Sequence, residues 1–583
     1  MIGIIRRTDV SYAVNAGLIT LALTTFFVLS ATPAFAQKRV IRKWVDRVDS
    51  APTNGSGVAP VTATDSQGDV YVAGNPNLVW GANQPQLLEV IKYNPAGTKV
   101  WSDVINTPGY SPYEFAITVD SAGNVFVGAA ADPGDIYQEF VVAKVSSAGS
   151  TAWVATYVFQ EFNGPSSSVG GIVVDSLGNA YLTGLERQDT CASLTTIKFS
   201  PAGAKLWLKQ FSGQNGFAGA SGIALDSQND VYVTGQVRGC TNDFNPPNPA
   251  GVTIKYNTNG TQLWAAYTGK NSAPSGTTVY DNTALAVDSS GNSYVAGWFN
   301  TNGAKCRPST SPQPLCETGY VVKYSSTGAE VWSQQNALWG SNALKLDRED
   351  NVYTAGAYIT PTSSHMSVTK LNSSGTLLWN RQYQHTATGD DEAFALAVSY
   401  DSDAYVIGQS TSTNNATGLD CITLKFDYKG DLDWVAVYNG PGNRNDVGVG
   451  VAFSGQYLYV VAQSVGTNLQ PGWATIEYLQ DAAVVTPSSR TFASQKIGTT
   501  SAAQTVTLTN TYWGSDLKLM GIDVHGPFAQ TNNCSSSIVP FGTCTITITY
   551  HPTATGVQTG SIDIYDQWAG RPAIISLTGA GTN

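Results

Sequence analysis

Charged side chains are scarce in this sequence, at 13% of 583 residues, where an ordinary soluble domain has about a quarter. The 31 basic residues are outnumbered by 42 acidic ones, which gives a net charge of -11. A chain with this balance does not attract a phosphate backbone. We therefore expect no nucleic-acid partner.

Histidine and cysteine are also rare, and they are scattered. Zinc sites need closely spaced Cys and His ligands, but the four histidines are His365, His385, His525 and His551. A Ser/His/Asp triad could form only around His365 or His385, and neither lies in a nucleophile elbow. The acidic run Asp390–Glu392 is predicted to be a solvated loop. The sequence thus predicts no metal, no cofactor and no catalytic residue.

Long hydrophobic runs are limited to one, Gly17–Ser30, which is shorter than the roughly 20 residues that span a bilayer. Arg6 and Arg7 precede this run, and Ala34 and Ala36 form an A-x-A cleavage site after it. This pattern is typical of a secretory signal peptide over residues 1–36; an uncleaved anchor is the alternative. We expect a mature chain without a membrane span that is secreted, periplasmic or at the cell surface.

Glycine and aromatic residues are abundant, and they recur in register. Seven copies of K-x4-G-x3-W are present, with their lysines at Lys92, Lys144, Lys198, Lys255, Lys323, Lys370 and Lys425. A second block, Asp-Ser-x-Gly-Asn/Asp-x-Tyr, precedes each copy. Its aromatic position recurs eight times at intervals of 51 to 62 residues, at Tyr71, Phe126, Tyr181, Tyr232, Tyr294, Tyr353, Tyr405 and Tyr459.

Each repeat has the pattern of four short strands joined by tight turns that contain Gly. Four antiparallel strands repeated about every 50 residues predict a β-propeller, with eight blades over residues 37–482. The eighth repeat lacks a final Trp strand, whereas an orphan strand around Trp44 precedes the first repeat. We therefore predict that the strand around Trp44 completes the last blade and closes the ring.

These blocks resemble the SBBP β-propeller repeat of secreted bacterial proteins, over about three quarters of the chain. The Gly-x3-Trp pair is also similar to the tryptophan docking repeat of eight-bladed quinoprotein dehydrogenases. Members of that second group carry an adjacent Cys pair, which this sequence lacks.

The repeat ends near Val484, and period-two strands separated by Gly and Pro turns follow. They predict an immunoglobulin-like β-sandwich over residues 483–583. The segment from Thr491 to Gly579 resembles the abnormal-spindle/Hydin-type domains. That resemblance implies an interaction or spacing module and not an enzyme.

Seven cysteines all lie in the part predicted to be exported, where disulfides are permitted. Cys534 and Cys544 flank a turn of the sandwich and are predicted to pair, as in the domain family that it resembles. Cys306 and Cys316 bracket an insertion and are predicted to pair too. Cys191 and Cys240 lie in equivalent loops of adjacent blades, where a bridge is plausible, and Cys421 is left over.

The repeated polar and aromatic residues have competing interpretations. The Asp that opens six of the eight first turns could bind calcium, but a turn carboxylate that accepts backbone N–H groups explains it better, since Ser399 and Phe453 take this position in the last two units. The Lys column could line a cationic channel; we favour amines paired with turn carboxylates or carbonyls. The Trp column is interpreted as an anchor between blades.

The loops between second and third strands, and those between blades, are long and dissimilar. Variable loops on a rigid scaffold are the usual place for binding, and aromatic or Arg side chains form hot spots. We predict ligand-binding residues at Trp298, Trp339, Trp473, Tyr358 and Arg187 on this long-loop face. The predicted function is non-catalytic binding of a protein or glycan at the cell surface. The alternative is an exported enzyme, a quinoprotein-like oxidoreductase or a polysaccharide-active enzyme, with its site at the central channel.

Overall fold

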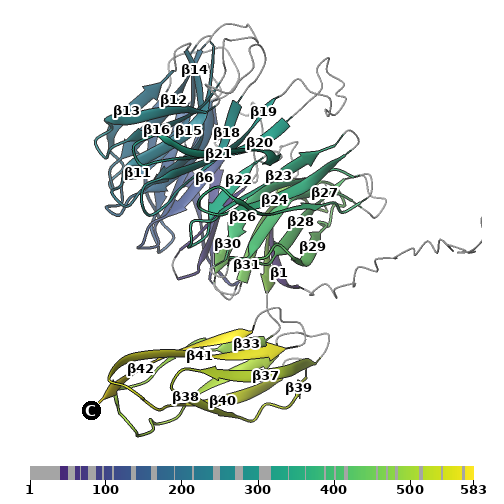
Figure 1. Cartoon of the computed structure of the whole chain (residues 1–583). Coiled ribbons are helices and arrows are strands. Elements are labelled where there is room, and N and C mark those ends of the chain that lie inside the picture. The colour runs from purple at the N-terminus through teal and green to yellow at the C-terminus, as the bar shows by residue number, and fades with distance from the viewer. Residues whose placement is uncertain are drawn as a thin grey trace, which may run out of the picture. The chain divides into compact units, whose positions relative to one another are not determined.

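The computed structural model describes residues 40–583 apart from 50–59, 66, 76–86, 95–96, 108–110, 133–138, 159–166, 189–190, 213–215, 240–249, 269–279, 301–316, 339–340, 361–362, 387–388, 400–401, 413–417, 455–456, 468–469, 480–482, 511–515, 540–541 and 567–571. Within these ranges every regular element is a β-strand (Figure 1). The all-β prediction is confirmed. The predicted signal peptide lies outside the described residues.

Eight antiparallel four-stranded units account for the repeated region, and we number them in chain order. Unit 1 contains β2 (Val61–Thr64), β3 (Val70–Gly74), β4 (Leu87–Tyr93) and β5 (Lys99–Asn106). Unit 2 contains β6 (Ser111–Val119), β7 (Val125–Asp132), β8 (Glu139–Val145) and β9 (Thr151–Val158). Unit 3 contains β10 (Ser168–Val174), β11 (Ala180–Gln188), β12 (Cys191–Phe199) and β13 (Lys205–Phe211). Unit 4 contains β14 (Gly216–Leu225), β15 (Val231–Gly239), β16 (Ala250–Tyr256) and β17 (Gln262–Thr268).

The remaining four units repeat this order of strands. Unit 5 contains β18 (Tyr280–Val287), β19 (Ser293–Asn300), β20 (Glu317–Tyr324) and β21 (Glu330–Leu338). Unit 6 contains β22 (Ala343–Leu346), β23 (Val352–Ile359), β24 (Ser364–Leu371) and β25 (Leu377–Tyr383). Unit 7 contains β26 (Asp391–Val398), β27 (Ala404–Thr411), β28 (Leu419–Phe426) and β29 (Leu432–Tyr438). Unit 8 contains β30 (Asp446–Ser454), β31 (Tyr457–Val465), β32 (Pro471–Leu479) and β1 (Ile41–Asp49).

The first strands of the units contact one another in a closed cycle. The order of contacts is β2, β6, β10, β14, β18, β22, β26, β30 and back to β2. Side-chain hydrogen bonds join some neighbouring units at these strands. Asn342, directly before β22, donates from Nδ2 to the carbonyl oxygen of Ala393 at 2.9 Å, and Ser221, at the bulge of β14, donates to the carbonyl oxygen of Asn282. This arrangement is that of a β-propeller, in which sheets surround a central axis.

The eighth unit takes its outer strand from the other end of the repeated region. β1 pairs antiparallel with β32, and Trp44 lies opposite Glu477. Each other unit places its Trp opposite a Lys at the same point of the ladder, as Trp101 lies opposite Lys92. The predicted pairing of the Trp44 strand with the last unit is therefore confirmed.

Hairpins inside the units form because an Asp or Asn side chain and a Gly supply what a tight turn needs. The Oδ1 atom of Asp120 accepts the backbone N–H groups of Ala122 and Asn124 at 2.9 and 2.8 Å. Gly123 has a φ of 77°, which a residue without Cβ adopts readily. Asp65, Asp175, Asp226, Asp288 and Asp347 make the equivalent bonds. The turn interpretation of the Asp column is confirmed.

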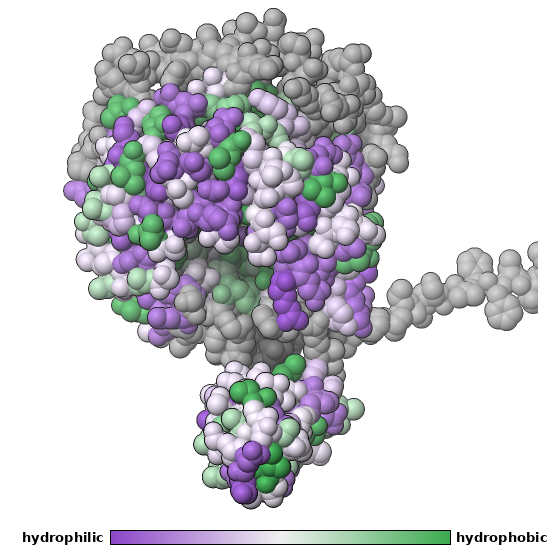
Figure 2. Space-filling model, turned by 60° about the vertical axis from the view of Figure 1, so that its left-hand side comes forward, coloured by the Kyte–Doolittle hydropathy of each residue, from purple (hydrophilic) through white to green (hydrophobic). Residues whose placement is uncertain are grey.

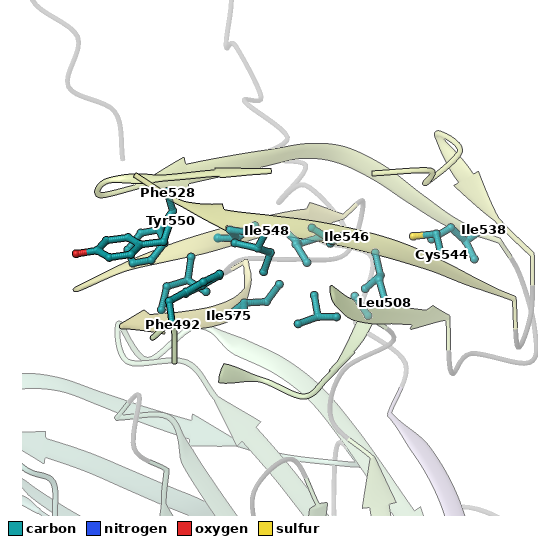
Figure 3. Packing of buried hydrophobic residues seen from close by; sticks show 14 of the residues in the cluster. Phe492, Leu508, Phe528, Ile538, Cys544, Ile546, Ile548, Tyr550 and Ile575 are labelled. Atoms are coloured by element: carbon teal, nitrogen blue, oxygen red, sulfur yellow. The ribbon is translucent and has the colours of Figure 1, made fainter. Parts of the chain in front are cut away.

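After the repeat, two further sheets enclose a core of their own. One contains β33 (Ala483–Thr486), β36 (Gln504–Asn510), β40 (Thr543–Tyr550) and β38 (Phe528–Asn532). The other contains β34 (Ser489–Thr491), β35 (Gln495–Lys496), β42 (Ala573–Thr582), β41 (Gly556–Asp566), β37 (Leu517–His525) and β39 (Ser537–Ile538). Phe492, Phe528 and Tyr550 stack at one end of this core, and Leu508, Ile546 and Ile575 extend it (Figure 3). Alternating inward residues produce this packing, as in β40, where every second residue is buried.

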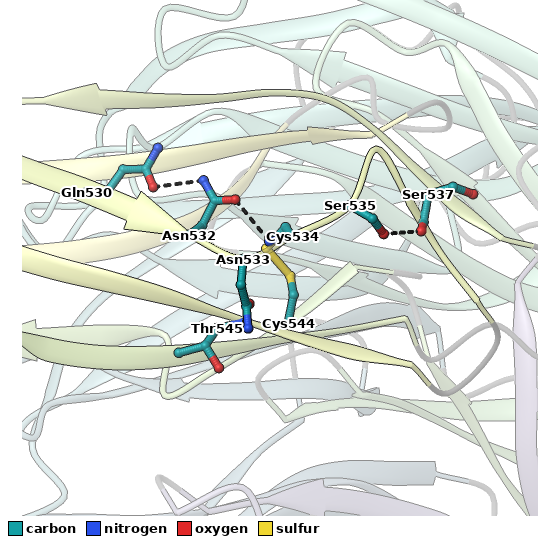
Figure 4. The surroundings of a disulfide bond; sticks show 8 residues. All are labelled: Gln530, Asn532, Asn533, Cys534, Ser535, Ser537, Cys544 and Thr545. Atoms are coloured by element: carbon teal, nitrogen blue, oxygen red, sulfur yellow. Dashed lines mark hydrogen bonds between the residues drawn. A yellow bond between two sulfur atoms is a disulfide. The ribbon is translucent and has the colours of Figure 1, made fainter.

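A disulfide joins Cys534 and Cys544 in this region, as predicted (Figure 4). Asn532 accepts the backbone N–H of Cys534 at 3.0 Å, which fixes the turn that carries the bond. The proposed pairs Cys306–Cys316 and Cys191–Cys240 rest on residues or side chains outside the described part of the chain. Cys421 is a free, buried thiol.

Candidate functional site

The repeated lysines are held inside the scaffold. Lys255 lies 2.9 Å from Asp226 and 3.1 Å from Asp230 through its Nζ atom, and that atom stands 4.8 Å from the ring centre of Tyr232. Both the ion pairs and the cation–π contact satisfy the ammonium group without a ligand. Burial raises the pKa of Tyr232 to about 12, although the nearby lysine opposes that shift.

The same arrangement recurs around the ring with small changes of partner. Carboxylates within 4 Å of the amine are found for Lys92, Lys198, Lys323, Lys370 and Lys425. Lys144 instead lies over the ring of Phe126, 5.0 Å from its centre. The Lys column is thus structural, as predicted.

The tryptophan column joins each unit to the next. Trp153 of unit 2 donates from Nε1 to the carbonyl oxygen of Pro201 in unit 3 at 2.9 Å. Its ring covers Gly203, where an added Cβ would lie 2.8 Å from the indole. The equivalent Trp–Gly pairs are Trp101–Gly149, Trp207–Gly260, Trp264–Gly328, Trp332–Gly375 and Trp379–Gly430. The interpretation of these residues as anchors between repeats is confirmed.

Trp44 makes the corresponding contact at the junction between units 8 and 1. Its ring covers Gly97 of unit 1, and its Nε1 donates to Oε2 of Glu477 at 2.5 Å. Arg47 on the same strand donates to the hydroxyls of Tyr438 and Ser464, each at 2.7 Å. Glu477 stands at the position that the repeated Lys takes in the other units, and it accepts the indole N–H.

The structure describes the side chains of only some of the residues predicted to bind a ligand on the long-loop face. Trp298 on β19 and Tyr358 on β23 are half-buried and stand near the long-loop ends of adjacent units. The side chain of Arg187 and the whole of Trp339 lie outside the described residues. Ligand binding by these four residues stays a prediction.

Trp473, which was predicted to bind a ligand on the long-loop face, has a side chain that is only 1% exposed. The residue lies on β32, between β31 and β1. Its ring packs with Val70, Val72 and Ile91 of unit 1. A strand covered on both edges and packed against the next unit leaves no surface for a ligand.

A cluster of His and Asp residues lies at the long-loop end of units 6 and 7, and sequence reasoning missed it. Asp391, Ser410 and Asp420 stand side by side on β26, β27 and β28, and all three are buried. The backbone N–H of His385 donates to Oδ2 of Asp391 at 2.9 Å. The solvated loop predicted for Asp390–Glu392 is therefore wrong, since Asp391 and Glu392 begin β26.

His365 and its surroundings complete the cluster. Its ring centre is 5.8 Å from that of Tyr358, and its Nε2 lies 3.2 Å from the hydroxyl of Ser363. Ser364 donates instead to Asp390, through its backbone N–H at 2.8 Å and its hydroxyl at 3.3 Å. His365 therefore contacts Ser363, whereas Asp390 contacts Ser364. These contacts do not form a continuous Ser–His–Asp relay. We call His365, His385, Asp390, Asp391 and Asp420 the His–Asp cluster.

Burial dominates the electrostatics of this cluster. It raises the pKa of Asp391, while the backbone N–H and imidazole of His385 and the imidazole of His365 oppose the shift. It raises the pKa of Asp420 too, against the effect of Ser412 and His385. Tyr383, whose hydroxyl is 3.1 Å from Nδ1 of His385, has a pKa raised to about 12 by burial and by Asp391. The cluster can accept and donate hydrogen bonds beside two flat rings, Tyr358 and Tyr383.

Other kinds of site receive no support from the residues that the structure describes. Among them, no group of three or more His, Cys, Asp or Glu residues is arranged to hold a metal ion. In the same residues, no helix has the length and apolar character that crossing a bilayer requires.

Exposed aliphatic residues such as Val100, Leu206 and Val331 occur on the fourth strands, and hydrophobic and hydrophilic residues are interspersed on the face shown in Figure 2.

Comparison with known proteins gives one relative by sequence. An uncharacterized WD repeat-containing protein of Acanthamoeba polyphaga mimivirus is 25% identical over 334 residues, which cover 49% of this chain and 21% of that protein. The chain therefore spans about a fifth of that relative's length. No family model matches.

Solved structures give weak likenesses. A Dyadobacter fermentans protein of unknown function has a TM-score of 0.36 and 7% identity, covering 76% of this chain and 99% of that one. A eukaryotic initiation factor has a TM-score of 0.31 and 9% identity, covering 66% and 89%. Both TM-scores lie below 0.5, so neither likeness bears on function. The WD-repeat relative and the repeated four-stranded sheets together indicate a β-propeller repeat protein.

Proposed function

We propose that this chain is an exported, non-catalytic binding protein that captures a protein or a glycan on its long-loop face. In this proposal the eight units are the blades of one SBBP-type propeller, the signal peptide directs export, and the C-terminal sheets form an immunoglobulin-like spacer or second contact. The observation that carries the proposal is that the repeated and the unrepeated polar residues have different surroundings. The repeated Asp, Lys and Trp residues are bonded within the scaffold, whereas the unrepeated His–Asp cluster and Tyr358 gather at the long-loop end.

The chemistry of that end suits recognition. Tyr358 offers a half-buried ring beside His365. Asp390, which accepts the backbone N–H of Ser364, and His385, whose backbone N–H donates to Asp391, add polar groups at the same end of units 6 and 7. Flat rings with a few fixed polar groups are the usual composition of a binding site. Trp298 on the neighbouring unit would extend the contact surface, whereas Trp473 takes no part.

The test is capture by the full mature chain on a glycan array and from an extracellular protein extract, followed by the same measurement on variants. Tyr358→Ala should abolish capture, and Trp298→Ala should weaken it. Tyr428→Ala is the matched control, because Tyr428 is 40% exposed but belongs to a hairpin turn at the opposite end of unit 7.

Equal capture by Tyr358→Ala and the wild type would reject the long-loop face, as would failure of the wild type to capture anything. Turnover of a captured glycan, or a quinone chromophore in the absorption spectrum of protein from its native host, would reject the non-catalytic part of the proposal.

A further inference from the structure

The outermost strand of unit 2, β9 (Thr151–Val158), leaves one edge of its sheet open. The strands of this unit are bonded in the order β6, β7, β8 and β9, so β9 is bonded to β8 on one side and ends the sheet on the other. In the part of the chain that the structure describes, β9 pairs with no other strand. The end strand of a sheet carries a row of backbone N–H and C=O groups with which another extended chain can pair.

Charged side chains are a common protection of such an edge, because they discourage pairing with another chain. Six of the eight outer strands of the units have at least one charged residue: β1, β5, β13, β21, β25 and β29, with for example Arg47, Asp103, Lys205, Glu330, Arg381 and Asp433. The outer strands β9 and β17 have none, and their sequences are TAWVATYV and QLWAAYT.

Of these two uncharged strands, only β9 is exposed along its whole length. In β17 the last three residues are buried or half-buried, and Ala266 and Thr268 are covered. In β9 exposed and half-buried residues alternate to the end of the strand, and the exposed face consists of Ala152, Val154, Thr156 and Val158. Val154 and Val158 are 38% and 49% exposed. The edge of β9 is therefore both uncharged and accessible.

The neighbouring units hold β9 in its extended form. On the half-buried face, Trp153 donates to the carbonyl oxygen of Pro201 at 2.9 Å, and the Nζ atom of Lys205 stands 5.0 Å from the ring centre of Tyr157. At the start of the strand, Thr151 donates from its hydroxyl to Asp103 of unit 1 at 2.6 Å. Because the strand is already ordered, a partner would order only its own chain on binding, which favours association.

We propose that the open edge of β9 is a docking site for an extended, uncharged segment of another protein, which adds to unit 2 as a fifth strand. Main-chain hydrogen bonds would provide the affinity, and alternate side chains of the segment would provide the selectivity. Apolar or β-branched side chains would lie beside Val154 and Val158, where a charged side chain would lose water without gaining a counter-ion.

The charge of the chain favours another protein over a second copy as the partner. The net charge of -11 makes two copies repel each other, whereas a segment of a less acidic protein meets no such opposition. The eight residues of β9 set the length of segment that can pair along the full edge. This docking site lies on an outer strand and does not depend on the long-loop face.

The first test measures binding of a labelled peptide to the full chain by fluorescence anisotropy. The probe has the sequence of β9 itself, Thr-Ala-Trp-Val-Ala-Thr-Tyr-Val, with two lysines outside the pairing segment for solubility. The control peptide has the same sequence with its inner amides N-methylated, which removes the backbone donors. The unmodified peptide should bind, and the methylated one should bind about tenfold more weakly or less. Equal binding of the two peptides, or no binding of the unmodified one, would overturn the proposal.

The second test uses variants of the edge. Val154→Lys places a charge on the exposed face of β9 and should weaken binding of the unmodified peptide about tenfold or more, whereas Val154→Thr should bind it as the wild type does. Val331→Lys is the matched control, because Val331 is 55% exposed on β21, the outer strand of unit 5. Since Val154 is on the surface, Val154→Lys should keep the urea midpoint of the wild type. Undiminished binding by Val154→Lys would show that the peptide docks elsewhere.

The third test identifies the occupant of the edge. With the unmodified peptide bound, hydrogen exchange should slow in residues 151–158 and stay unchanged in β21. Sedimentation velocity should give the same state of association for the wild type and Val154→Lys. A dimer that forms in the wild type and is lost in Val154→Lys would assign the edge to a second copy of the chain and would overturn the choice of partner. Slower exchange only outside β9 would overturn the site.

Discussion

Replacing Lys255 by Met tests whether the lysine column stabilises the fold. The substitution keeps the aliphatic chain over the ring of Tyr232 but removes the ammonium that lies 2.9 Å from Asp226 and 3.1 Å from Asp230. The side chain of Asp226 is 1% exposed. Removing one partner of a buried ion pair leaves an uncompensated charge, which destabilises a protein by about 3 to 5 kcal/mol.

The lower end of that range applies here. Asp226 keeps three donors after the substitution, the backbone N–H groups of Gln228 and Asp230 and the hydroxyl of Tyr232. We therefore expect Lys255→Met to lower the free energy of unfolding by about 3 kcal/mol, measured by urea denaturation followed by tryptophan fluorescence. Lys99→Met is the matched control: Lys99 is 43% exposed and 3.9 Å from Glu89, so its loss should change stability by less than about 1 kcal/mol.

The triple variant Lys255→Met, Asp226→Asn, Asp230→Asn should recover part of the loss, because it removes the stranded charges together with the cation. If Lys255→Met were as stable as the wild type, the lysine column would not be a structural element. Its amines would then need another explanation, such as a ligand.

Two further perturbations address the junctions between units and the His–Asp cluster. In urea denaturation, Gly203→Ala should destabilise the protein by more than Gly178→Ala does. Both glycines have a φ near +80°, which costs an L-residue about 1 to 2 kcal/mol, but only at Gly203 would the added Cβ also push against the indole of Trp153. Equal losses of stability in the two variants would refute the anchoring role of the tryptophan. The pKa of Asp391 is raised in the folded state, so the folded protein holds this proton more tightly than the unfolded chain and the associated stability is lost as pH rises through the folded pKa. Asp391→Asn should therefore gain stability relative to the wild type between pH 4 and pH 7, and an unchanged difference across that interval would contradict the burial argument.

The scaffold was readable from the sequence because its signals are local and repeated. The Asp, Gly and Trp of each unit act within one hairpin or between adjacent hairpins, so their spacing survives in the chain. Trp44 could be placed because the eighth repeat lacks its own Trp strand. Residues 1–36, Trp339 and the pairs around Cys306 and Cys240 lie outside the described residues, and their predictions stay predictions.

What the sequence did not reveal depends on neighbours that are distant in the chain. Trp473 looked like a loop aromatic because it begins a strand next to a long loop, but β1, more than 400 residues away, covers it. Asp391 looked like part of a solvated acidic run because its buried place beside Ser410 and Asp420 depends on strand register.

Hydrogen exchange of the amides in residues 41–49 of the full chain tests most directly whether one strand closes the ring of units. The structure pairs this strand with β32 from Ile41 to Asp49, and Trp44 covers Gly97 of the first unit. The account predicts that amides of β1 bonded to β32 exchange as slowly as those of β31. Exchange of residues 41–49 at the rate of an unfolded peptide, with β31 still protected, would contradict it.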